Sequence, residues 1–198
     1  RAFNGCTALT SVTFANVKEV GEFSFENSKL TSADLKTVEI VGQRAFYKST
    51  DLKNVIFGKN LKSLQEGAFA YTGISSVSIP GTVTDMKENV FSGCTNMKNA
   101  FVAKGITTVS KGCFSGNTAL EEVTLPATLT SVGQYAFSNC TSLKTVNYDG
   151  TKEQWKNVSV EENNEPLVAL MGEEVINVTG IALNKSELTL NLGGRTES

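Results

Sequence analysis

The sequence predicts a repeat solenoid of about seven coils, each 21–23 residues long, and two observations carry this prediction. A phenylalanine recurs every 21 to 23 residues, and several aliphatic columns keep the same period. The seven phenylalanines are Phe3, Phe25, Phe46, Phe69, Phe91, Phe114 and Phe137. Such a period is typical of solenoids, in which each repeat buries its apolar face only against its neighbours. We therefore expect the seven rings to stack in one internal column.

Each coil is predicted to hold one parallel strand with the pattern L-x-x-V-x-L. Its last two apolar positions, such as Val123 and Leu125, have period two and therefore lie on one face of a strand. The intervening positions face outward and form two ladders along the solenoid. The first ladder is Ser11, Ser32, Asn54, Ser76, Asn99, Glu122 and Thr145, and the second is Thr13, Asp34, Ile56, Ser78, Phe101, Thr124 and Asn147. A second short strand is predicted at the V-x-x-V-G segment that precedes each phenylalanine.

Two apolar residues interrupt these otherwise small and polar ladders, and they are our candidates for a binding surface. Ile56 and Phe101 are the predicted apolar anchors, because aromatic side chains are enriched at interface hot spots. The predicted polar surround is Asp34, Asn99, Glu122 and Asn147. The alternative is that both are isolated exposed hydrophobes, which are common on protein surfaces and carry no function.

Composition excludes several other classes of function for these residues. The formal net charge is −2, which gives no basic surface for nucleic acid, and no apolar run is long enough to cross a bilayer. Histidine is absent, so Ser-His, Cys-His and zinc-dependent hydrolytic sites are excluded. No phosphate-binding glycine loop is present. We expect no enzyme activity, no metal and no cofactor.

The four cysteines are expected to be free. Cys6, Cys94 and Cys140 share the column three residues after the phenylalanine, too far apart across stacked coils to bridge. We interpret them as small buried hydrophobes. A bridge between Cys94 and Cys113, which lie in adjacent coils, is the alternative.

The unit V-x-x-(V/I)-G-x-x-A-F-x-x-C-x-x-L-x-x-V-x-(L/I)-P, seen at 129–148 and 61–80, resembles the BspA-like leucine-rich repeat of bacterial surface proteins. The resemblance covers 1–148, and it implies a leucine-rich-repeat-like solenoid. It also implies an exported, extracellular protein of the bacterial cell surface that binds a protein or glycan on a host or neighbouring cell. A structural stalk that spaces another domain from the wall is the alternative. We expect a monomer, with residue 1 at a fragment boundary.

Residues 149–176 break the period and resemble the tail that closes such arrays, with Y-x-G-T-x-x-x-W and a late N-x-x-L. Thr151 and Gln154 have capping-box spacing, which predicts a short helix that places Trp155 over the last coil. The alternative role of Trp155 is a platform for a ligand. The acidic stretch 161–165 is expected to be a loop, with calcium binding as the weaker alternative.

Residues 177–198 follow a third sequence pattern, V-T-G-I-x-L-N-K-x-x-L-T-L-x-x-G. This segment resembles the opening strands of a bacterial Ig-like domain of group 2. The match is only some 20 residues long, so the domain would be truncated. Two strands cannot bury a core of their own, and we expect this end to be partly disordered or to rest on the cap.

Overall fold

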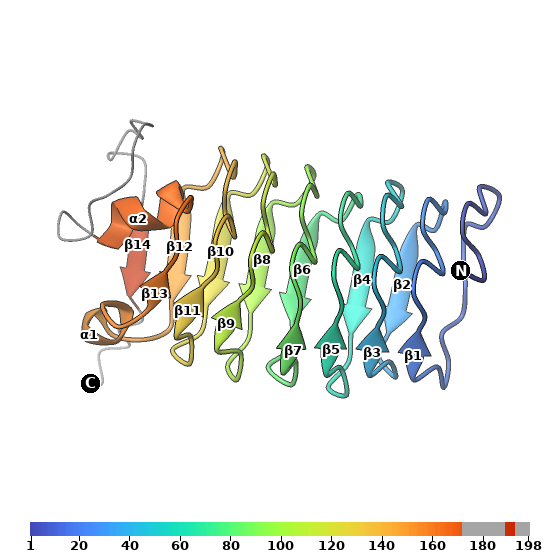
Figure 1. Ribbon diagram of the computed structural model, residues 1–198, viewed down its shortest axis with the longest axis horizontal. Coiled ribbons are helices and arrows are strands. Elements are labelled where there is room, and N and C mark those ends of the chain that lie inside the picture. Colours follow the sequence, from blue (N-terminus) through green and yellow to red (C-terminus); the bar gives the residue numbers. More distant parts are fainter. Residues whose placement is uncertain (172–188, 193–198) are drawn as a thin grey trace, which may run out of the picture.

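A computed structural model of the chain describes residues 1–171 and 189–192. The chain forms a solenoid whose coils stack along one axis, from the N-terminal coil to a cap that contains two short helices (Figure 1). Each repeat after the first contributes a four-residue strand to one side and a two-residue strand to the other, and apolar side chains fill the space between them. The predicted solenoid of parallel strands is confirmed.

The four-residue strands form what we call the main sheet, at the predicted L-x-x-V-x-L positions. They are β2 (Ser32–Leu35), β4 (Asn54–Phe57), β6 (Ser76–Ile79), β8 (Asn99–Val102), β10 (Glu122–Leu125) and β12 (Thr145–Tyr148). Every pair within it is parallel. Among the described residues six coils carry such a strand, not the predicted seven, because positions 11–14 of the first coil form none.

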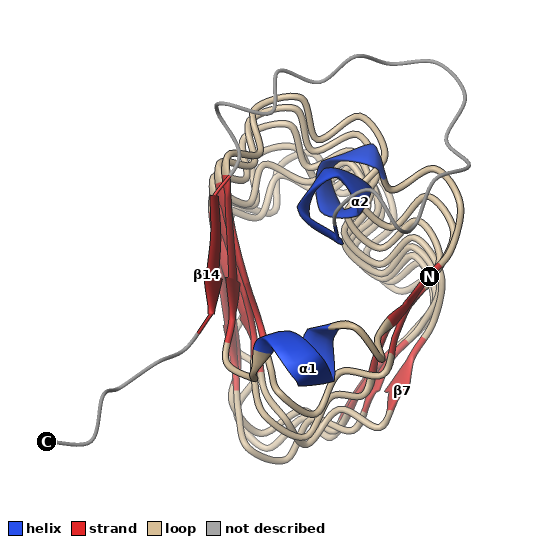
Figure 2. Cartoon of the chain, turned by 90° about the vertical axis from the view of Figure 1, so that its left-hand side faces the viewer, coloured by secondary structure: helices blue, strands red, loops and turns tan. Residues whose placement is uncertain are grey.

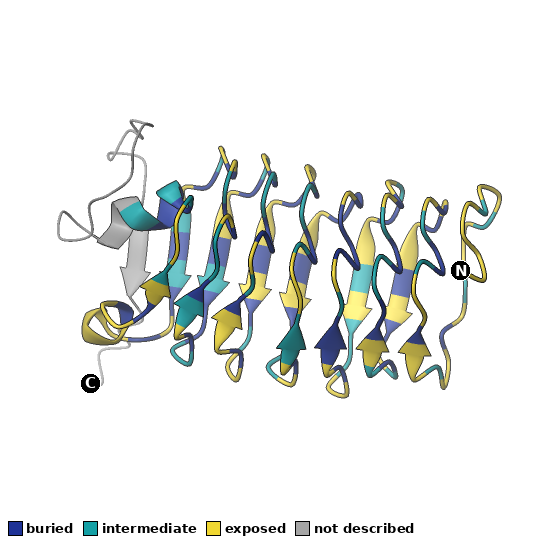
Figure 3. Cartoon of the chain, viewed as in Figure 1, coloured by how far each residue is buried: buried dark blue, intermediate teal, exposed yellow. Residues whose placement is uncertain are grey.

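The two-residue strands form the second sheet, at the predicted V-x-x-V-G segments. They are β1 (Glu19–Val20), β3 (Ile40–Val41), β5 (Ser63–Leu64), β7 (Asp85–Met86), β9 (Thr108–Val109) and β11 (Ser131–Val132). β1, β3, β5 and β7 form one parallel group, whereas β9 and β11 belong to another. Along β2, β6 and β8 of the main sheet, buried and exposed residues alternate, which is the pattern of strands with one face in a core (Figure 3).

The predicted phenylalanine column is present. Consecutive rings stack nearly parallel, with centroids 5.0–5.8 Å apart and interplanar angles of 8–23°. The rings from Phe46 to Phe137 are fully buried, whereas Phe3, at the end of the column, is 42 % exposed. The column is therefore continuous through all seven repeats, including the first.

The turn that carries each phenylalanine also joins the coils through main-chain hydrogen bonds. The amide of Phe46 donates to the Ala68 carbonyl (2.8 Å), and that of Phe114 donates to the Ala136 carbonyl (2.8 Å). In every coil but the last, the phenylalanine amide donates to the residue that precedes the next phenylalanine. All these amides point toward the C-terminal end, so the last coil presents donors that need partners from elsewhere.

The cysteine column has a role that the sequence interpretation missed. The Cys94 thiol donates to the Phe69 carbonyl of the preceding coil, and the Cys140 thiol donates to the Phe114 carbonyl, both at 3.2 Å. In the same column the Ser49 hydroxyl donates to the Phe25 carbonyl at 2.6 Å. These residues are thus small hydrogen-bond donors between coils, and not merely small hydrophobes.

All four cysteines are free. Burial raises the pKa of the Cys94 thiol to about 11 and that of Cys140 to about 12, and it raises the pKa of Cys113 further. These thiols therefore stay protonated at neutral pH, which is the form that donates to a carbonyl.

The cap closes the C-terminal end, where α1 (Lys152–Trp155) and α2 (Glu165–Met171) lie across the coil (Figure 2). The predicted capping box is present, because Thr151 accepts from the Gln154 amide and the Gln154 side chain accepts from the Thr151 amide. Trp155 is only 2 % exposed and lies against Tyr148, with ring centroids 5.0 Å apart. The prediction that it covers the last coil is confirmed, and a ligand platform at this residue is wrong because the ring is buried.

Both sheets gain one strand beyond the last coil, one from the cap segment and one from the segment 177–198. β13 (Ser159–Val160) pairs with β11, and β14 (Thr189–Leu192) pairs with β12, both in parallel. Of the segment that resembles an Ig-like domain, 177–188 and 193–198 lie outside the described residues. The same holds for 172–176 of the predicted cap segment.

Candidate functional site

The main sheet is divided between β4 and β6. β2 pairs with β4, and β6 begins a separate sheet that continues through β8, β10, β12 and β14. The two parts stay joined just before the strands, where the Ser75 amide donates to the Lys53 carbonyl (3.3 Å). Beyond that bond, β4 and β6 share no ladder in the described part of the chain. We call this division the split.

The split exposes side chains that face the core in every other strand. Val55 and Phe57 point inward from β4, yet both are only partly buried. On β6 the equivalent Val77 and Ile79 are 5 % and 0 % exposed, and the remaining four strands bury this pair as well. Core side chains of one coil are thus open to a partner from outside.

The size of Phe57 explains why the sheet divides here. Its ring lies edge-on to Phe69 in the next coil (5.5 Å) and reaches Phe91 in the coil after that (6.5 Å). Leu35, Ile79, Val102 and Leu125 hold this position in four of the other paired strands, and Tyr148 holds it in β12, the strand of the last coil. A ring that extends under two coils occupies the space in which the next strand would settle, so β6 is held away from β4.

The first coil supports this explanation independently. Phe14 occupies the same column as Phe57, and its ring reaches Phe25 (5.5 Å) and Phe46 (6.2 Å), again one and two coils on. Here too the segment fails to pair with the next main-sheet strand, β2. Each phenylalanine at this inward position is therefore accompanied by a break in the main sheet. Tyr148, the remaining aromatic in the column, lies at the C-terminal end under Trp155.

The turns on the two sides of the split lean away from each other. A Cβ at Gly58 would lie 1.9 Å from the Lys36 carbonyl oxygen of the preceding coil, and one at Gly81 would lie 1.7 Å from the Lys104 carbonyl oxygen of the following coil. Only glycine permits either approach. The turn after β4 thus packs backward and the turn after β6 packs forward.

A groove of about 590 Å³ lies at the split, and we call it the β4–β6 groove. Residues of β4, β6, β8 and β10 line it, together with Pro80. Ile56 and Phe101 stand on its two sides, 49 % and 44 % exposed. Serine, threonine, asparagine and glutamate side chains supply the rest of its outward surface.

The structure brings together four of the six predicted binding residues. Ile56, Asn99, Phe101 and Glu122 all line the β4–β6 groove. The predicted ladders are continuous from β6 to β12, where Ser78, Phe101, Thr124 and Asn147 are in register, but they are interrupted at the split. Ile56 and Phe101 therefore belong to separate sheets and face one groove.

The other two predicted residues lie apart from this groove. Asp34 lines a smaller groove beside the first coil, where Lys36 bonds its carboxylate at 3.0 Å and thereby lowers the pKa of that carboxyl. Asn147 is on β12 and does not line the groove, but its side-chain amide donates to the carboxylate of Glu122, which does.

Sequence reasoning missed Val55, Phe57 and Pro80 as groove residues. It treated the first two as ordinary core positions. The signal that identifies them is the size of Phe57, because its column holds Leu, Ile or Val in every coil between the first and the last except this one. The interval 161–165 also has a role that was missed: Asn164 is fully buried in the cap and Glu161 accepts from the Gln134 amide (2.9 Å).

No metal or cofactor site emerges from the residues that the structure describes. Within 1–171 and 189–192, no three His, Cys, Asp or Glu side chains gather in a way that could hold a metal ion. None of the helices in those ranges is both long and apolar enough to cross a membrane. The chemistry of the groove is that of contact, through apolar side chains, hydroxyls, amides and one carboxylate.

Comparison with known proteins agrees with this architecture. A family described as the BspA type leucine rich repeat region, in six copies, matches residues 1–98 and 39–165. The chain belongs to this BspA-type leucine-rich repeat family. No curated protein matches it significantly.

Two solved structures share the fold. A leucine-rich repeat protein from Bacteroides ovatus is 22 % identical, with a TM-score of 0.53, and the match covers 80 % of this chain and 53 % of that one. A leucine rich repeat protein from T. pallidum is 17 % identical, with a TM-score of 0.50, and the match covers 80 % and 78 %. The BspA-type chain described here thus spans about half the length of the Bacteroides ovatus protein.

Proposed function

We propose that this chain is a non-catalytic binding and adhesion module of a bacterial cell-surface protein, and that it contacts a host or neighbouring cell through its main sheet. The observation that carries the proposal is the meeting of Ile56 and Phe101 at one groove. Two large exposed apolar side chains beside partly open core residues make an anchor site of the kind that interfaces use. The family resemblance supports the extracellular setting.

The rigidity of the solenoid favours this use. Parallel strands in register present one outward residue of each ladder about every 4.8 Å, so a partner meets a surface that is already ordered. Binding then costs little conformational entropy on the side of this protein. The partner would be a protein or a glycan, and the module would act as a monomer.

The competing proposal is a stalk that spaces another domain from the cell wall. Most outward positions of the main sheet, such as Ser76, Ser78 and Thr124, are small and polar, which suits a surface without a partner. The resemblance of 177–198 to the start of an Ig-like domain fits a spacer equally well.

A binding screen against extracellular-matrix proteins and surface glycans tests the proposal. The intact chain is compared with the double variant Ile56→Ser, Phe101→Ser, and with Ile40→Ser as the matched control. Ile40 is a similarly exposed isoleucine (37 %), but it lies on β3 of the second sheet. We expect the double variant to lose about 2 kcal/mol or more, roughly 30-fold in affinity, while Ile40→Ser binds as the intact chain does.

Two outcomes would contradict the proposal. Equal binding by the intact chain and the double variant, with both folded by circular dichroism, would move the contact from the sheet to the loops. Absence of binding by every protein in the screen would favour the stalk.

A further inference from the structure

Charged side chains surround the β4–β6 groove, and they indicate which kind of partner it binds. Four exposed lysines stand at the ends of the two strands that flank it. Lys53 directly precedes β4 and Lys98 directly precedes β8, while Lys59 and Lys104 lie two residues beyond the ends of the same strands. Within the described residues none of the four takes part in a salt bridge.

Two lysines beside other main-sheet strands lie away from the groove. Lys36, beyond β2, pairs with Asp34 at 3.0 Å, whereas Lys144, before β12, is exposed like the four at the groove. β6, which lies between β4 and β8, has Ser75 before it and Pro80 after it, so it brings no charge of its own. Glu122 is the one carboxylate that lines the groove, and it accepts a hydrogen bond from Asn147. Glu121 directly precedes β10, in the position that Lys98 holds before β8. The groove is therefore apolar at its centre, and the four lysines outnumber the two glutamates, Glu121 and Glu122, around it.

The main chain at the split narrows the type of ligand. β4 pairs with β2 and β6 pairs with β8, so the edges that β4 and β6 turn toward each other carry amide and carbonyl groups without strand partners in the described part of the chain. An extended peptide presents complementary groups at the same spacing, whereas a glycan has no such regular series. The partly exposed Val55 and Phe57 offer contact to apolar side chains of the same peptide.

We propose that the β4–β6 groove binds an extended peptide segment with an apolar centre and acidic residues at both ends. This inference rests on the proposed function and specifies its partner. Lys53 and Lys59 are six positions apart, so acidic groups about six residues apart, roughly 20 Å in an extended chain, would reach the two lysine pairs at once. Phe57 holds the groove open, and Ile56 and Phe101 hold the apolar side chains of the ligand.

The test uses fluorescence anisotropy with three labelled synthetic peptides and labelled heparin. The first peptide has a Val-Ser-Leu centre with two glutamates at each end, so that its outermost glutamates are six positions apart. The second replaces all the glutamates by lysines, and the third replaces them by glutamines. We expect the acidic peptide to bind at least about tenfold more tightly than the other two, with an affinity that falls as salt rises. A tighter complex with heparin, the lysine peptide or the glutamine peptide would overturn the proposal, as would failure of the acidic peptide to bind.

Two variants locate the site. Lys53→Glu with Lys98→Glu reverses two exposed charges at the groove and is expected to lower affinity for the acidic peptide at least about tenfold. Lys144→Glu with Lys156→Glu is the matched control, because it changes the net charge by the same amount. Lys144 directly precedes β12 just as Lys98 precedes β8, Lys156 follows α1 in the cap, and the pair should have little effect. Equal losses in both variants would show only a general charge effect and would overturn the assignment to the groove.

Phe57→Leu tests the groove itself, because leucine occupies this column in paired strands and should let β6 approach β4. We expect the variant to stay folded and to lose binding of the acidic peptide, although every outward side chain is unchanged. Undiminished binding would overturn the role of the split. If the acidic peptide fails while a matrix protein still binds through Ile56 and Phe101, this inference fails and the proposed function stands.

Discussion

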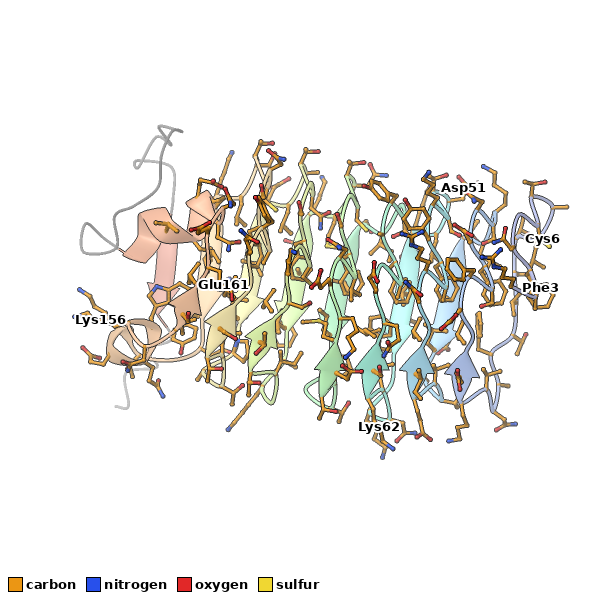
Figure 4. The ribbon with its side chains drawn as sticks, in the orientation of Figure 1. Phe3, Cys6, Asp51, Lys62, Lys156 and Glu161 are labelled. Carbon is orange, nitrogen blue, oxygen red and sulfur yellow. The ribbon has the colours of Figure 1, made fainter. Side chains whose placement is uncertain are left out.

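The first and the last coil of the described solenoid differ in how far their equivalent residues are buried. In the first coil Phe3 is 42 % exposed, and Leu9, Val12 and Val17 are only partly buried. At the C-terminal end the equivalent Phe137 and Val146 are fully buried, because Trp155, Asn164 and Leu167 cover the last coil. Figure 4 labels Phe3 and Cys6 on the open end and Lys156 and Glu161 near the covered one.

The comparison shows that the burial of a repeat depends on the elements packed against it, and not on its own sequence alone. Nothing in the pattern around Phe3 differs enough from that around Phe137 to explain their exposures, since both have a small residue before them and a cysteine three positions after them. What differs is the presence of a cover. This is the behaviour expected when each coil contacts only the next, so that stability depends on interfaces between coils.

The cap does more than hide apolar surface, because it replaces the hydrogen bonds of a missing coil. The Phe137 amide donates to Oδ1 of Asn164 (2.9 Å), whereas every earlier phenylalanine amide donates to a carbonyl of the next coil. The Asn164 side-chain amide donates in turn to the Gly133 carbonyl (2.9 Å) and the Glu161 carbonyl (2.8 Å). The main-chain amide of Tyr135 donates to the Glu162 carbonyl (3.1 Å).

The largest loss of stability is expected for a substitution in the middle of the solenoid, where each coil is covered on both sides by its neighbours. Phe69→Ala removes a ring stacked between Phe46 and Phe91 and leaves a cavity that neither neighbour can fill. We expect the free energy of unfolding to fall by about 5 kcal/mol, the upper end for a buried aromatic residue. Urea denaturation measures it, and a loss below about 2 kcal/mol would contradict the tight stacking of the coils.

Removal of the cover should cost somewhat less. Trp155→Ala takes away the ring that lies against Tyr148 and opens the last coil to water. We expect a loss of about 3–4 kcal/mol in the free energy of unfolding, which is a typical value for emptying an aromatic core site. If the thermal midpoint of this variant matched that of the intact chain, the segment after residue 148 would not be a cap.

Asn164→Ala separates the hydrogen bonds of the cap from its apolar contacts. The change leaves the Phe137 amide and the Gly133 carbonyl without their buried partner, and we expect a cost of about 1–3 kcal/mol. Asn157→Ala is the control, because it also removes an amide, but one that donates to the Glu153 carbonyl at the surface. Equal unfolding midpoints for the two variants would show that Asn164 adds nothing beyond an ordinary surface amide.

The smallest effect is expected at the open end. Phe3→Ala removes one stacking contact, with Phe25 at 5.2 Å, from a ring that is already exposed on its other side. We expect a loss of about 1 kcal/mol, which is typical of a single aromatic pair. A loss as large as that of Phe69→Ala would mean that position in the stack does not decide the energy, and the comparison of the two ends would fail.

The period, the strands and the phenylalanine column could all be predicted from the sequence, because each is set by side-chain character at a fixed spacing. The split could not, since the ladders were drawn on the assumption that every strand pairs with the next. Whether the ring of Phe57 fits the column or forces β6 away depends on how much space the neighbouring coils leave for it. The spacing of residues along the sequence does not show that space. The sequence therefore placed Ile56 and Phe101 on the correct face but on one continuous sheet.

Asn164 and the cysteines show a second kind of limit. Asn164 and Leu167 belong to the N-x-x-L element by which 149–176 resembles the tail of such arrays, and both are buried. The partner of the Asn164 side chain, however, is the main-chain amide of Phe137 in the last coil. The thiol of Cys94 likewise faces a carbonyl 25 positions earlier in the chain. The sequence identifies side chains but does not show which main-chain groups they will meet. A side chain that bonds to the main chain is therefore interpreted from the sequence as a hydrophobic or loop residue.

The most direct test of the account uses the phenylalanine amides, which occupy equivalent positions in all seven repeats. Native-state hydrogen exchange followed by NMR would measure their protection one by one. We expect the lowest protection at Phe3, a rise toward a plateau from Phe46 to Phe114, and protection at Phe137 as high as on that plateau, because Asn164 stands in for a further coil. A Phe137 amide that exchanges as fast as that of Phe3 would contradict the claim that the cap completes the last coil.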